Sequence, residues 1–230
     1  GLKMHAMEPI PPAAPLEEIK TELRKVTLLR KTNNGNNEVY LFDSHSSPLL
    51  MNETGRIREL TFRHAGGGTG KSIDVDEYDL SAEHPQKQLI VWDPDNNEIV
   101  GGYRFIFRER HEKDFTVDRF ASSAYFTFSG KFRRKYLRHT MELGRSFVKP
   151  EYQTGTMGRK SLFALDNLWD GLGAIVIDNP QIRYLFGKVA THPWLCSKFD
   201  PGDILVAIKA AYFKLLLCLV VDAGALLALV

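Results

Sequence analysis

The sequence predicts a mixed α/β fold in which helices pack on one sheet. Apolar residues recur at helical spacing in three segments, and short apolar runs bounded by turn residues are typical of strands elsewhere. The chain has 230 residues, of which 43% are hydrophobic, so it can bury a core. Because the expected strands and helices do not alternate regularly, a doubly wound parallel sheet is not expected.

Two helices are expected before residue 65. Residues 16–30 carry leucine, isoleucine and valine at helical spacing, with charged residues between them. Ser47 can cap a second helix, which has Pro48 in its first turn and continues to about Phe62. The glycines of residues 66–70 must then lie in a loop.

A β-hairpin is expected in the middle of the chain. Residues 88–93 and 99–107 are typical of strands, and the polar residues 95–97 form the turn between them. Residues 108–140 form a basic and aromatic insert of mixed helix and loop. The remaining expected elements are a helix at 160–177 and single strands at 39–42, 141–148 and 184–189.

The expected organisation is one domain with two extensions. Residues 1–15 are rich in proline and lack an apolar run, which indicates a disordered arm. Residues 16–195 form the domain, and residues 196–230 are an apolar C-terminal segment whose uninterrupted run is too short to span a bilayer. Three interpretations of this segment stay open: a core-packing helix, an interfacial membrane helix, or a segment outside the domain.

Charge and cysteine content exclude several classes of protein. Thirty basic and 28 acidic residues give a net charge of +2, which disfavours binding to nucleic acid by net charge. Two cysteines, Cys196 and Cys218, cannot form a disulfide framework or a four-cysteine zinc site. We therefore expect a protein of the reducing cytoplasm, with membrane association as an open alternative.

Residues 65–72 fit the loosest form of a phosphate-binding loop. In that interpretation Lys71 would contact the terminal phosphates and Ser72 would bind magnesium. Such a loop must follow a buried strand and begin a helix, whereas here a charged helix precedes it and an acidic segment follows. A loop with a coincidental motif is favoured over nucleotide hydrolysis.

Charged residues inside apolar strands are the candidate catalytic and binding residues. Arg104 lies in one such strand, and Glu142 and Arg145 lie in another, where alternation places them on opposite faces. Asp76 and Asp79 are expected to pair with these arginines. Two interpretations are open: a structural network of ion pairs, or a polar cleft that binds a charged substrate and contains a base.

Several segments, taken together, resemble one family. It is the acyl-carrier-protein-dependent branch of the GNAT-type N-acyltransferases, which contains autoinducer (acyl-homoserine lactone) synthases and the amino-acid N-acyltransferases that make ornithine and glycine lipids. Its members are often labelled hemolysins. The resemblance covers about residues 50 to 190, and the matching segments are RIRELTFR (56–63), DVDEYD (74–79), IVGGYR (99–104), ELGRSFV (142–148), LWDGL (168–172) and YLFG (184–187).

The resemblance implies a GNAT fold, whose mixed sheet opens into a V between its fourth and fifth strands and holds an acyl-phosphopantetheine arm there. By residue matching, Glu142 corresponds to the proposed general base. Arg104 and Arg145 belong to the charged cluster around the cleft, with Asp76 and Asp79 as their partners.

The same matching assigns binding residues. Arg58 and Phe62 lie on the helix that shapes the acyl and amine side of the cleft. The residues expected to bind the acyl-phosphopantetheine donor are Phe147, Val148, Gln153, Gly158 and Arg159. The glycine spacing after residue 153 departs from the usual acetyl-CoA pattern, which is compatible with a carrier protein in place of free CoA as donor.

The implied reaction transfers a (3-hydroxy) fatty acyl group from acyl carrier protein, or from acyl-CoA, to the α-amine of glycine or ornithine for amino-acid lipid synthesis. It needs no metal and no tightly bound cofactor, because Glu142 would remove the proton of the amine. The open alternatives are an acyl-homoserine lactone synthase and a non-enzymatic, membrane-active, hemolysin-like protein.

The expected partners are the carrier protein, the amino acid and a peripheral membrane contact, with no nucleic acid. The basic insert is either a docking site for the acidic carrier protein or a solvated basic face. Its cations are Arg108, Arg110, Lys131, Arg133, Arg134, Lys135 and Arg138. Five phenylalanines of this region are expected in the core more than in an acyl pocket: Phe105, Phe107, Phe126, Phe128 and Phe132.

Overall fold

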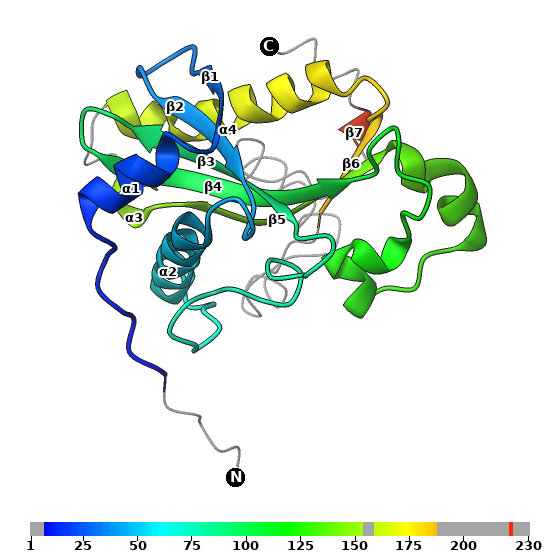
Figure 1. Cartoon of the computed structure of the whole chain (residues 1–230), viewed down its shortest axis with the longest axis horizontal. Coiled ribbons are helices and arrows are strands. Elements are labelled where there is room, and N and C mark those ends of the chain that lie inside the picture. Colours follow the sequence, from blue (N-terminus) through cyan, green and yellow to red (C-terminus); the bar gives the residue numbers. More distant parts are fainter. Residues whose placement is uncertain (1–6, 154–158, 188–220, 223–230) are drawn as a thin grey trace, which may run out of the picture. The chain divides into compact units, whose positions relative to one another are not determined.

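The computed structural model describes residues 7–153, 159–187, 221 and 222 (Figure 1). The interpretations of residues 196–230 as a helix or a separate segment lie almost entirely outside these residues. The chain divides into two compact units, which are described separately. The first unit contains the residues up to Phe105 together with Arg145–Ala174, and the second contains Ile106–Gly144 and the residues from Ile175 onward.

The first unit begins with a helix that is shorter than expected. Helix α1 (Leu16–Leu23) is followed by strand β1 (Thr27–Lys31), so the prediction of one helix over residues 16–30 is wrong. Strand β1 pairs antiparallel with β2 (Glu38–Phe42). The apolar periodicity does not distinguish the two elements here, because a short segment with a valine and a threonine gains more from pairing its backbone with β2 than from extending the helix.

The predicted hairpin is confirmed as β3 (Lys87–Asp93) and β4 (Glu98–Phe107), which pair antiparallel. Strand β2 pairs with the other edge of β3. A Cβ atom on Gly102 would lie 2.4 Å from the carbonyl oxygen of Leu89, and one on Gly101 would lie 2.5 Å from that of Phe147. Gly102 therefore allows the backbones of β4 and β3 to approach closely, and Gly101 does the same for β4 and its neighbour β5 (Thr140–Val148).

Helices cover both faces of this antiparallel sheet (Figure 1). The helix predicted from Ser47 is confirmed as α2 (Pro48–His64), because the Ser47 hydroxyl accepts a hydrogen bond from Leu50 N at 3.2 Å. It packs on a core that includes Leu50, Met51, Ile57, Ile90, Trp92 and Phe147. On the opposite face, Gly171 of α4 (Arg159–Asp178) lies against Leu89 and Val39, and the short α3 (Pro150–Gln153) follows β5.

The second unit contains a parallel strand pair. Residues Thr140–Leu143 of β5 pair with β6 (Tyr184–Gly187), and β6 pairs antiparallel with β7 (Val221–Asp222). Among the described residues, this pairing joins Thr140–Leu143 to Tyr184–Gly187. The mixed strand directions are consistent with the expected GNAT sheet.

The basic insert of the second unit folds into short helical turns around its own aromatic core. These turns are η1 (Val117–Arg119), η2 (Ala121–Ala124), the π-helical η3 (Phe132–Tyr136) and η4 (Leu137–His139). The core consists of Phe115, Val117, Phe120 and Leu137. Within the described part of the chain, no helix combines the length and the apolar character needed to cross a membrane.

Candidate active site

Arginine and aspartate side chains of the first unit gather into one cluster, called here the arginine–aspartate cluster. Its cations come from α2, β4 and β5, and its carboxylates come from the segment between α2 and β3. The members are Arg58, Arg104, Arg145, Asp74, Asp76 and Asp79. The sequence-based expectation of pairing between Asp76, Asp79 and the strand arginines is therefore confirmed.

Arg58 is the buried centre of the cluster, with a side chain that is 0% exposed. Its Nη2 atom lies 2.7 Å from Asp79 Oδ2, and its Nε and Nη2 atoms both donate to the backbone carbonyl of Asp74. Its Nη1 atom donates to Gln88 Oε1 at 3.3 Å, and the Gln88 amide in turn donates to Asp79 Oδ1 at 2.9 Å. A buried carboxylate is thus compensated by a guanidinium and an amide.

Two local features bring Asp74–Asp79 to Arg58. The first is Gly55, one turn before Arg58 in α2: a Cβ atom there would lie 2.4 Å from a methyl group of Val75, and the Gly55 carbonyl accepts a hydrogen bond from Asp74 N at 3.0 Å. The second is an Asx-type turn, in which Asp76 Oδ1 accepts hydrogen bonds from the backbone N–H groups two and three residues later. This turn places the Asp79 carboxylate toward α2.

Arg104 connects β4 to the same carboxylates. Its Nη1 atom lies 2.6 Å from Asp76 Oδ1 and 3.1 Å from Asp79 Oδ2, and its guanidinium carbon lies 5.7 Å from the centre of the Tyr78 ring. Burial alone would raise the pKa of Asp76, but the hydrogen bond and charge of Arg104 lower this pKa to about 2. Burial would also lower the pKa of Arg104, yet Asp79 and Asp76 raise it above its ordinary value. Both partners are therefore ionised at neutral pH.

Arg145 is the accessible cation of the cluster. Its side chain is 33% exposed, and its Nη2 atom lies 3.4 Å from Asp74 Oδ1 and 3.4 Å from Asp76 Oδ2. Its φ angle is +52°, in the left-handed region, which interrupts the alternation of β5 on which the face assignment depended. Burial raises the pKa of Asp74 although Arg58 and Arg145 oppose this, and among the described residues Asp74 Oδ2 has no hydrogen-bond partner.

Glu142, in the second unit, is a buried carboxylate with a relative exposure of 4%. Its Oε2 atom accepts a hydrogen bond from Ala121 N at 2.6 Å, and its Oε1 atom accepts one from Ser122 N at 2.9 Å. These N–H groups belong to the first turn of η2 and fix the orientation of the carboxylate. Glu142 lies three residues before Arg145 on β5.

The residues expected to bind the donor occupy the end of β5 and the segment after it. Phe147 and Val148 are buried at 3% and 4% exposure, and Gln153 donates a side-chain hydrogen bond to the carbonyl of Val148. Arg159 is the first residue of α4, and Gly158 lies outside the described residues. On the acceptor side, Phe62 is half-buried and packs against the α2 core.

The glycine-rich loop after α2 binds a carboxylate of its own chain. Glu59, at 0% exposure, accepts hydrogen bonds from Thr69 N at 2.9 Å, Thr69 Oγ1 at 2.7 Å and Gly70 N at 2.9 Å, and it pairs with Arg63 at 2.7 Å. Burial would raise the pKa of Glu59, but these hydrogen bonds lower it. Since α2 precedes the loop and the loop amides are occupied, its geometry is not that of a phosphate-binding loop.

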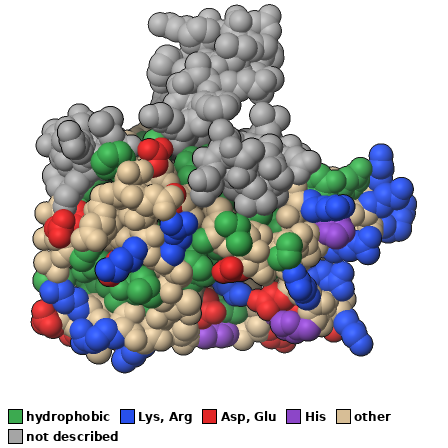
Figure 2. Space-filling view, turned by 90° about the horizontal axis from the view of Figure 1, so that it is seen from above, with side chains coloured by type: hydrophobic (Ala, Val, Ile, Leu, Met, Phe, Trp, Pro, Cys, Tyr) green, Lys and Arg blue, Asp and Glu red, His purple; other side chains and the backbone are tan. Residues whose placement is uncertain are grey.

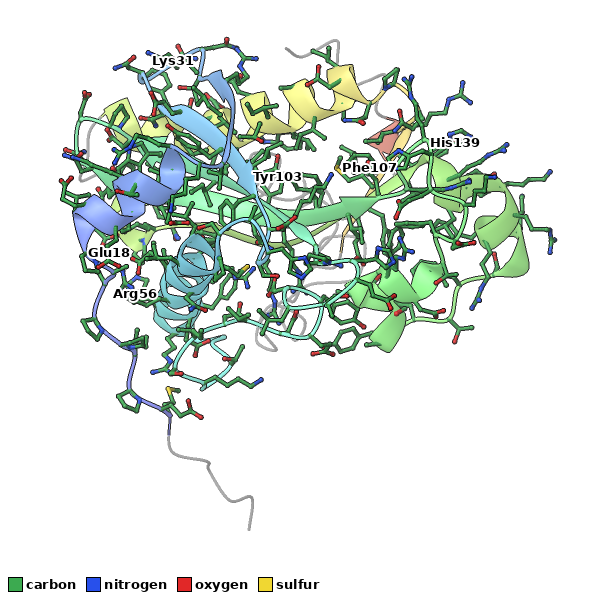
Figure 3. The ribbon with its side chains drawn as sticks, viewed as in Figure 1. Glu18, Lys31, Arg56, Tyr103, Phe107 and His139 are labelled. Carbon is green, nitrogen blue, oxygen red and sulfur yellow. The ribbon has the colours of Figure 1, made fainter. Side chains whose placement is uncertain are left out.

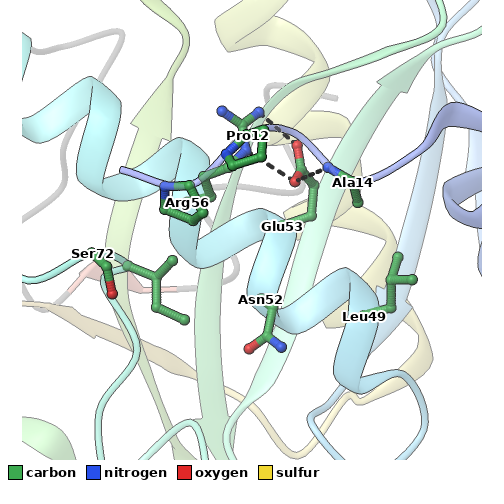
Figure 4. Close-up of a pocket in the computed structure, with 9 residues that line it drawn as sticks. Pro12, Ala14, Leu49, Asn52, Glu53, Arg56 and Ser72 are labelled. Carbon is green, nitrogen blue, oxygen red and sulfur yellow. Dashed lines mark hydrogen bonds and ion pairs between the residues drawn. The ribbon is translucent and has the colours of Figure 1, made fainter. Parts of the chain in front are cut away.

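A hollow of about 530 Å³ lies elsewhere in the first unit, beside α2 (Figure 4). The segment 7–15, which contains no helix or strand, forms one wall. Glu53 accepts a hydrogen bond from Ala14 N at 3.0 Å and pairs with Arg56 at 2.6 Å, so these three groups satisfy one another (Figure 4). None of the sequence-predicted site residues lines this hollow.

Comparison with known proteins identifies the family. Residues 57–161 match the model of an acetyltransferase (GNAT) domain. A glycine N(alpha)-acyltransferase of Bacteroides thetaiotaomicron is 50% identical over 188 residues, which are 81% of this chain and 56% of that protein. The glycine N(alpha)-acyltransferase of Phocaeicola vulgatus is 49% identical over 178 residues, 77% of this chain and 54% of that protein.

A third relative is named for a different amino acid. The L-ornithine N(alpha)-acyltransferase of Brucella abortus is 32% identical over 124 residues, 52% of this chain and 39% of that protein. This chain thus spans about half the length of the curated glycine acyltransferases that it matches. No solved structure matches the chain.

The matched GNAT range, residues 57–161, contains the arginine–aspartate cluster and Glu142. The mixed sheet, with β5 and β6 parallel, is the fold that the resemblance of the sequence implied. The chain belongs to the GNAT-type N-acyltransferase family.

Proposed function

We propose that this protein transfers a fatty acyl group from a phosphopantetheine thioester to the α-amine of glycine. The observation that carries the proposal is Arg145, a cation that is one-third exposed and is held only loosely, at 3.4 Å, by two carboxylates. A free amino acid needs such a cation for its carboxylate. Glycine is chosen over ornithine because the two relatives that are identical at about half of the aligned residues are named for glycine.

The proposed step is aminolysis. Glu142 takes a proton from the ammonium group of glycine, because an α-ammonium is mostly protonated at neutral pH and is not a nucleophile. The amine attacks the thioester carbonyl carbon, the C–N bond forms, and the C–S bond breaks. The attacking nitrogen loses a second proton as the amide forms. The thiolate leaves and takes up one of the two protons, and the other is released to the solvent. The buried carboxylate of Glu142, oriented by two backbone N–H groups, suits this role.

The other residues of the arginine–aspartate cluster hold Arg145 and the carboxylate-bearing segment 74–79 in place. Arg104 and Asp76 form a tight pair at 2.6 Å, and Asp76 contacts Arg145. Arg58 is fully buried and its donors are used by Asp79 and its neighbours, so we assign it a positioning role rather than contact with the amino acid. Phe62, on the same helix, remains a candidate wall of the acyl side.

For the donor, we propose acyl-phosphopantetheine carried by acyl carrier protein, with acyl-CoA as the simpler substitute. Phe147, Val148, Gln153, Gly158 and Arg159 would contact this arm at the end of β5 and beyond. The product, an N-acyl amino acid, is an amphiphile, so we place the reaction in the cytoplasm at a membrane surface and in amino-acid lipid synthesis.

The test is incubation of the 230-residue chain with 3-hydroxyacyl carrier protein or acyl-CoA and with glycine, ornithine or S-adenosylmethionine in turn. Mass spectrometry should detect N-acyl glycine and release of one thiol per product. If S-adenosylmethionine is the one acceptor that yields a product, and this product is a lactone, the protein would be assigned to the autoinducer synthases. Vesicle leakage without thiol release would favour the hemolysin-like interpretation.

Two variants test the assigned roles. Glu142→Gln keeps an acceptor oxygen for one of the two backbone N–H groups, and it should lower kcat about 100-fold or more, with little change in KM for glycine. Arg145→Gln should act mainly on KM for glycine, by about 10- to 100-fold, because it removes one charge-assisted interaction. Arg24→Gln, at an exposed position of the turn after α1, is the matched control and should change neither constant.

A further inference from the structure

A block of unpaired positive charge covers part of the second unit. Residues 120–139 contain no aspartate or glutamate. Five cations of this block are exposed, and among the described residues none of them forms an ion pair with a carboxylate: Lys131, Arg133, Arg134, Lys135 and Arg138. On most protein surfaces charges of both signs are interspersed, so a single-sign block without internal partners indicates an anionic partner.

Two large aromatic side chains are exposed just before these cations. Tyr125 is 68% exposed and Phe126 is 51% exposed, although the sequence favoured a core position for Phe126. Adjacent exposed aromatic side chains are unusual on a soluble surface and are enriched where a protein meets the interface of a bilayer. The apolar and cationic groups therefore belong to one short segment, residues 125–138.

The segment is held in shape by its own aromatic packing. Phe128 contacts Phe120 and Phe132, with ring centres 6.1 and 4.8 Å apart, and Phe132 stacks on Tyr136 at 6.4 Å. These contacts anchor the turns that carry the cations. In Figure 2, Lys and Arg side chains gather at the right-hand end of the view, which is the end where Figure 3 labels His139.

We infer that residues 125–138 form a docking surface for an anionic lipid bilayer, with Phe126 and Tyr125 inserted among the headgroups and the five cations above the phosphates. This combination of exposed aromatic rings and unpaired cations favours a bilayer over an acidic protein, which would need the cations but not the rings. The inference rests on the proposed function, since peripheral membrane contact is part of it. The experiment below measures binding alone, so it can fail while acyl transfer succeeds, and the reverse.

The experiment is co-sedimentation of the full chain with two kinds of vesicle, pure phosphatidylcholine and phosphatidylcholine with 30% phosphatidylglycerol. We expect partitioning onto the anionic vesicles to be at least 100-fold stronger and to weaken as salt is raised. The triple variant Arg133→Gln/Arg134→Gln/Lys135→Gln should lower this partition coefficient about 100-fold, at about 5-fold for each cation. Phe126→Ser should lower it about 10-fold.

A matched control removes the same number of charges from exposed positions of the first unit: Arg24→Gln/Lys25→Gln/Lys31→Gln. It should change the partition coefficient less than 3-fold. An equal loss for both triple variants would overturn the inference, because binding would then depend only on net charge. Equal binding to both kinds of vesicle would also overturn it and would point to another apolar part of the chain.

A carrier protein is the competing occupant. If the triple variant abolishes binding to acyl carrier protein while vesicle binding is absent in every variant, the surface is a protein interface and the inference is wrong. Far-UV circular dichroism of each variant checks that its fold is retained, and Tyr125→Ser gives a second aromatic variant should Phe126→Ser fail to fold.

Discussion

Residue 145 offers a test of the cluster that separates backbone conformation from charge. Its left-handed φ of +52° costs a non-glycine residue about 1 kcal/mol, and glycine would not have this cost. The ion pairs with Asp74 and Asp76 are long, at 3.4 Å, and partly exposed, so they contribute at most about 1 kcal/mol together. Arg145→Gly should therefore leave the free energy of unfolding almost unchanged, whereas Arg145→Ala should lower it by about 1 kcal/mol.

The measurement is urea unfolding followed by far-UV circular dichroism, with thermal unfolding as a check. Arg145→Gly should be more stable than Arg145→Ala by about 1 kcal/mol, or about 2–4 °C in Tm. In an ordinary strand the order is reversed, because glycine is less stable than alanine there by about 0.5–1 kcal/mol. The pair Ser146→Gly and Ser146→Ala, at the neighbouring strand position, provides this control. If alanine is the more stable residue at both positions, position 145 is an ordinary strand residue and the argument for its geometry fails.

Three further predictions concern the scaffold. Gly101→Ala should destabilise the protein by about 3 kcal/mol or more in urea unfolding, since its Cβ would lie 2.5 Å from a backbone oxygen, whereas at Gly67 the nearest atom is 4.0 Å away and alanine should be tolerated within about 0.5 kcal/mol. Arg58→Met should cost about 3–5 kcal/mol by removing the closest ionic partner of the buried Asp79 carboxylate, and a cost below 1 kcal/mol would contradict the assigned pairing. Asp76, with a folded pKa of about 2, contributes stability that is complete above its unfolded pKa and is lost as the pH falls toward 2. The difference in unfolding free energy between the wild type and Asp76→Asn, about 2 kcal/mol at pH 5, should therefore fall to about half at pH 3.

The fold could be predicted where the chain carries local stop and start signals. The Ser47 cap, the Pro48 that follows it and the polar turn between β3 and β4 each have one favourable local structure, and the structure contains all of them. Residues 24–31 lack such a signal. Their apolar spacing fits a helix, but the segment forms a strand because it pairs with β2. A local sequence pattern carries no information about that contact.

The candidate site, too, could be predicted from the sequence only in part. The cost of isolated charges in apolar strands predicts that Arg104 must have a carboxylate partner, and Asp76 and Asp79 are found there. Gln88 was missed, although a glutamine at 1% exposure inside an apolar strand is a comparable signal. The left-handed conformation of Arg145 could not be predicted, because nothing in the residue type favours it and the surrounding structure imposes it.

The charge balance of the cluster explains why Arg145, and not another arginine, is available to a substrate. Three guanidinium groups face three carboxylates, but the short contacts, at 2.6 to 3.1 Å, belong to Arg58 and Arg104, which are almost fully buried. Arg145 contacts Asp74 and Asp76 at longer distance and with access to solvent, and Asp76 already has a tight pair with Arg104. A substrate carboxylate that binds Arg145 therefore leaves the ion pairs of Arg58 and Arg104 in place, and the energy of that contact is available to hold glycine.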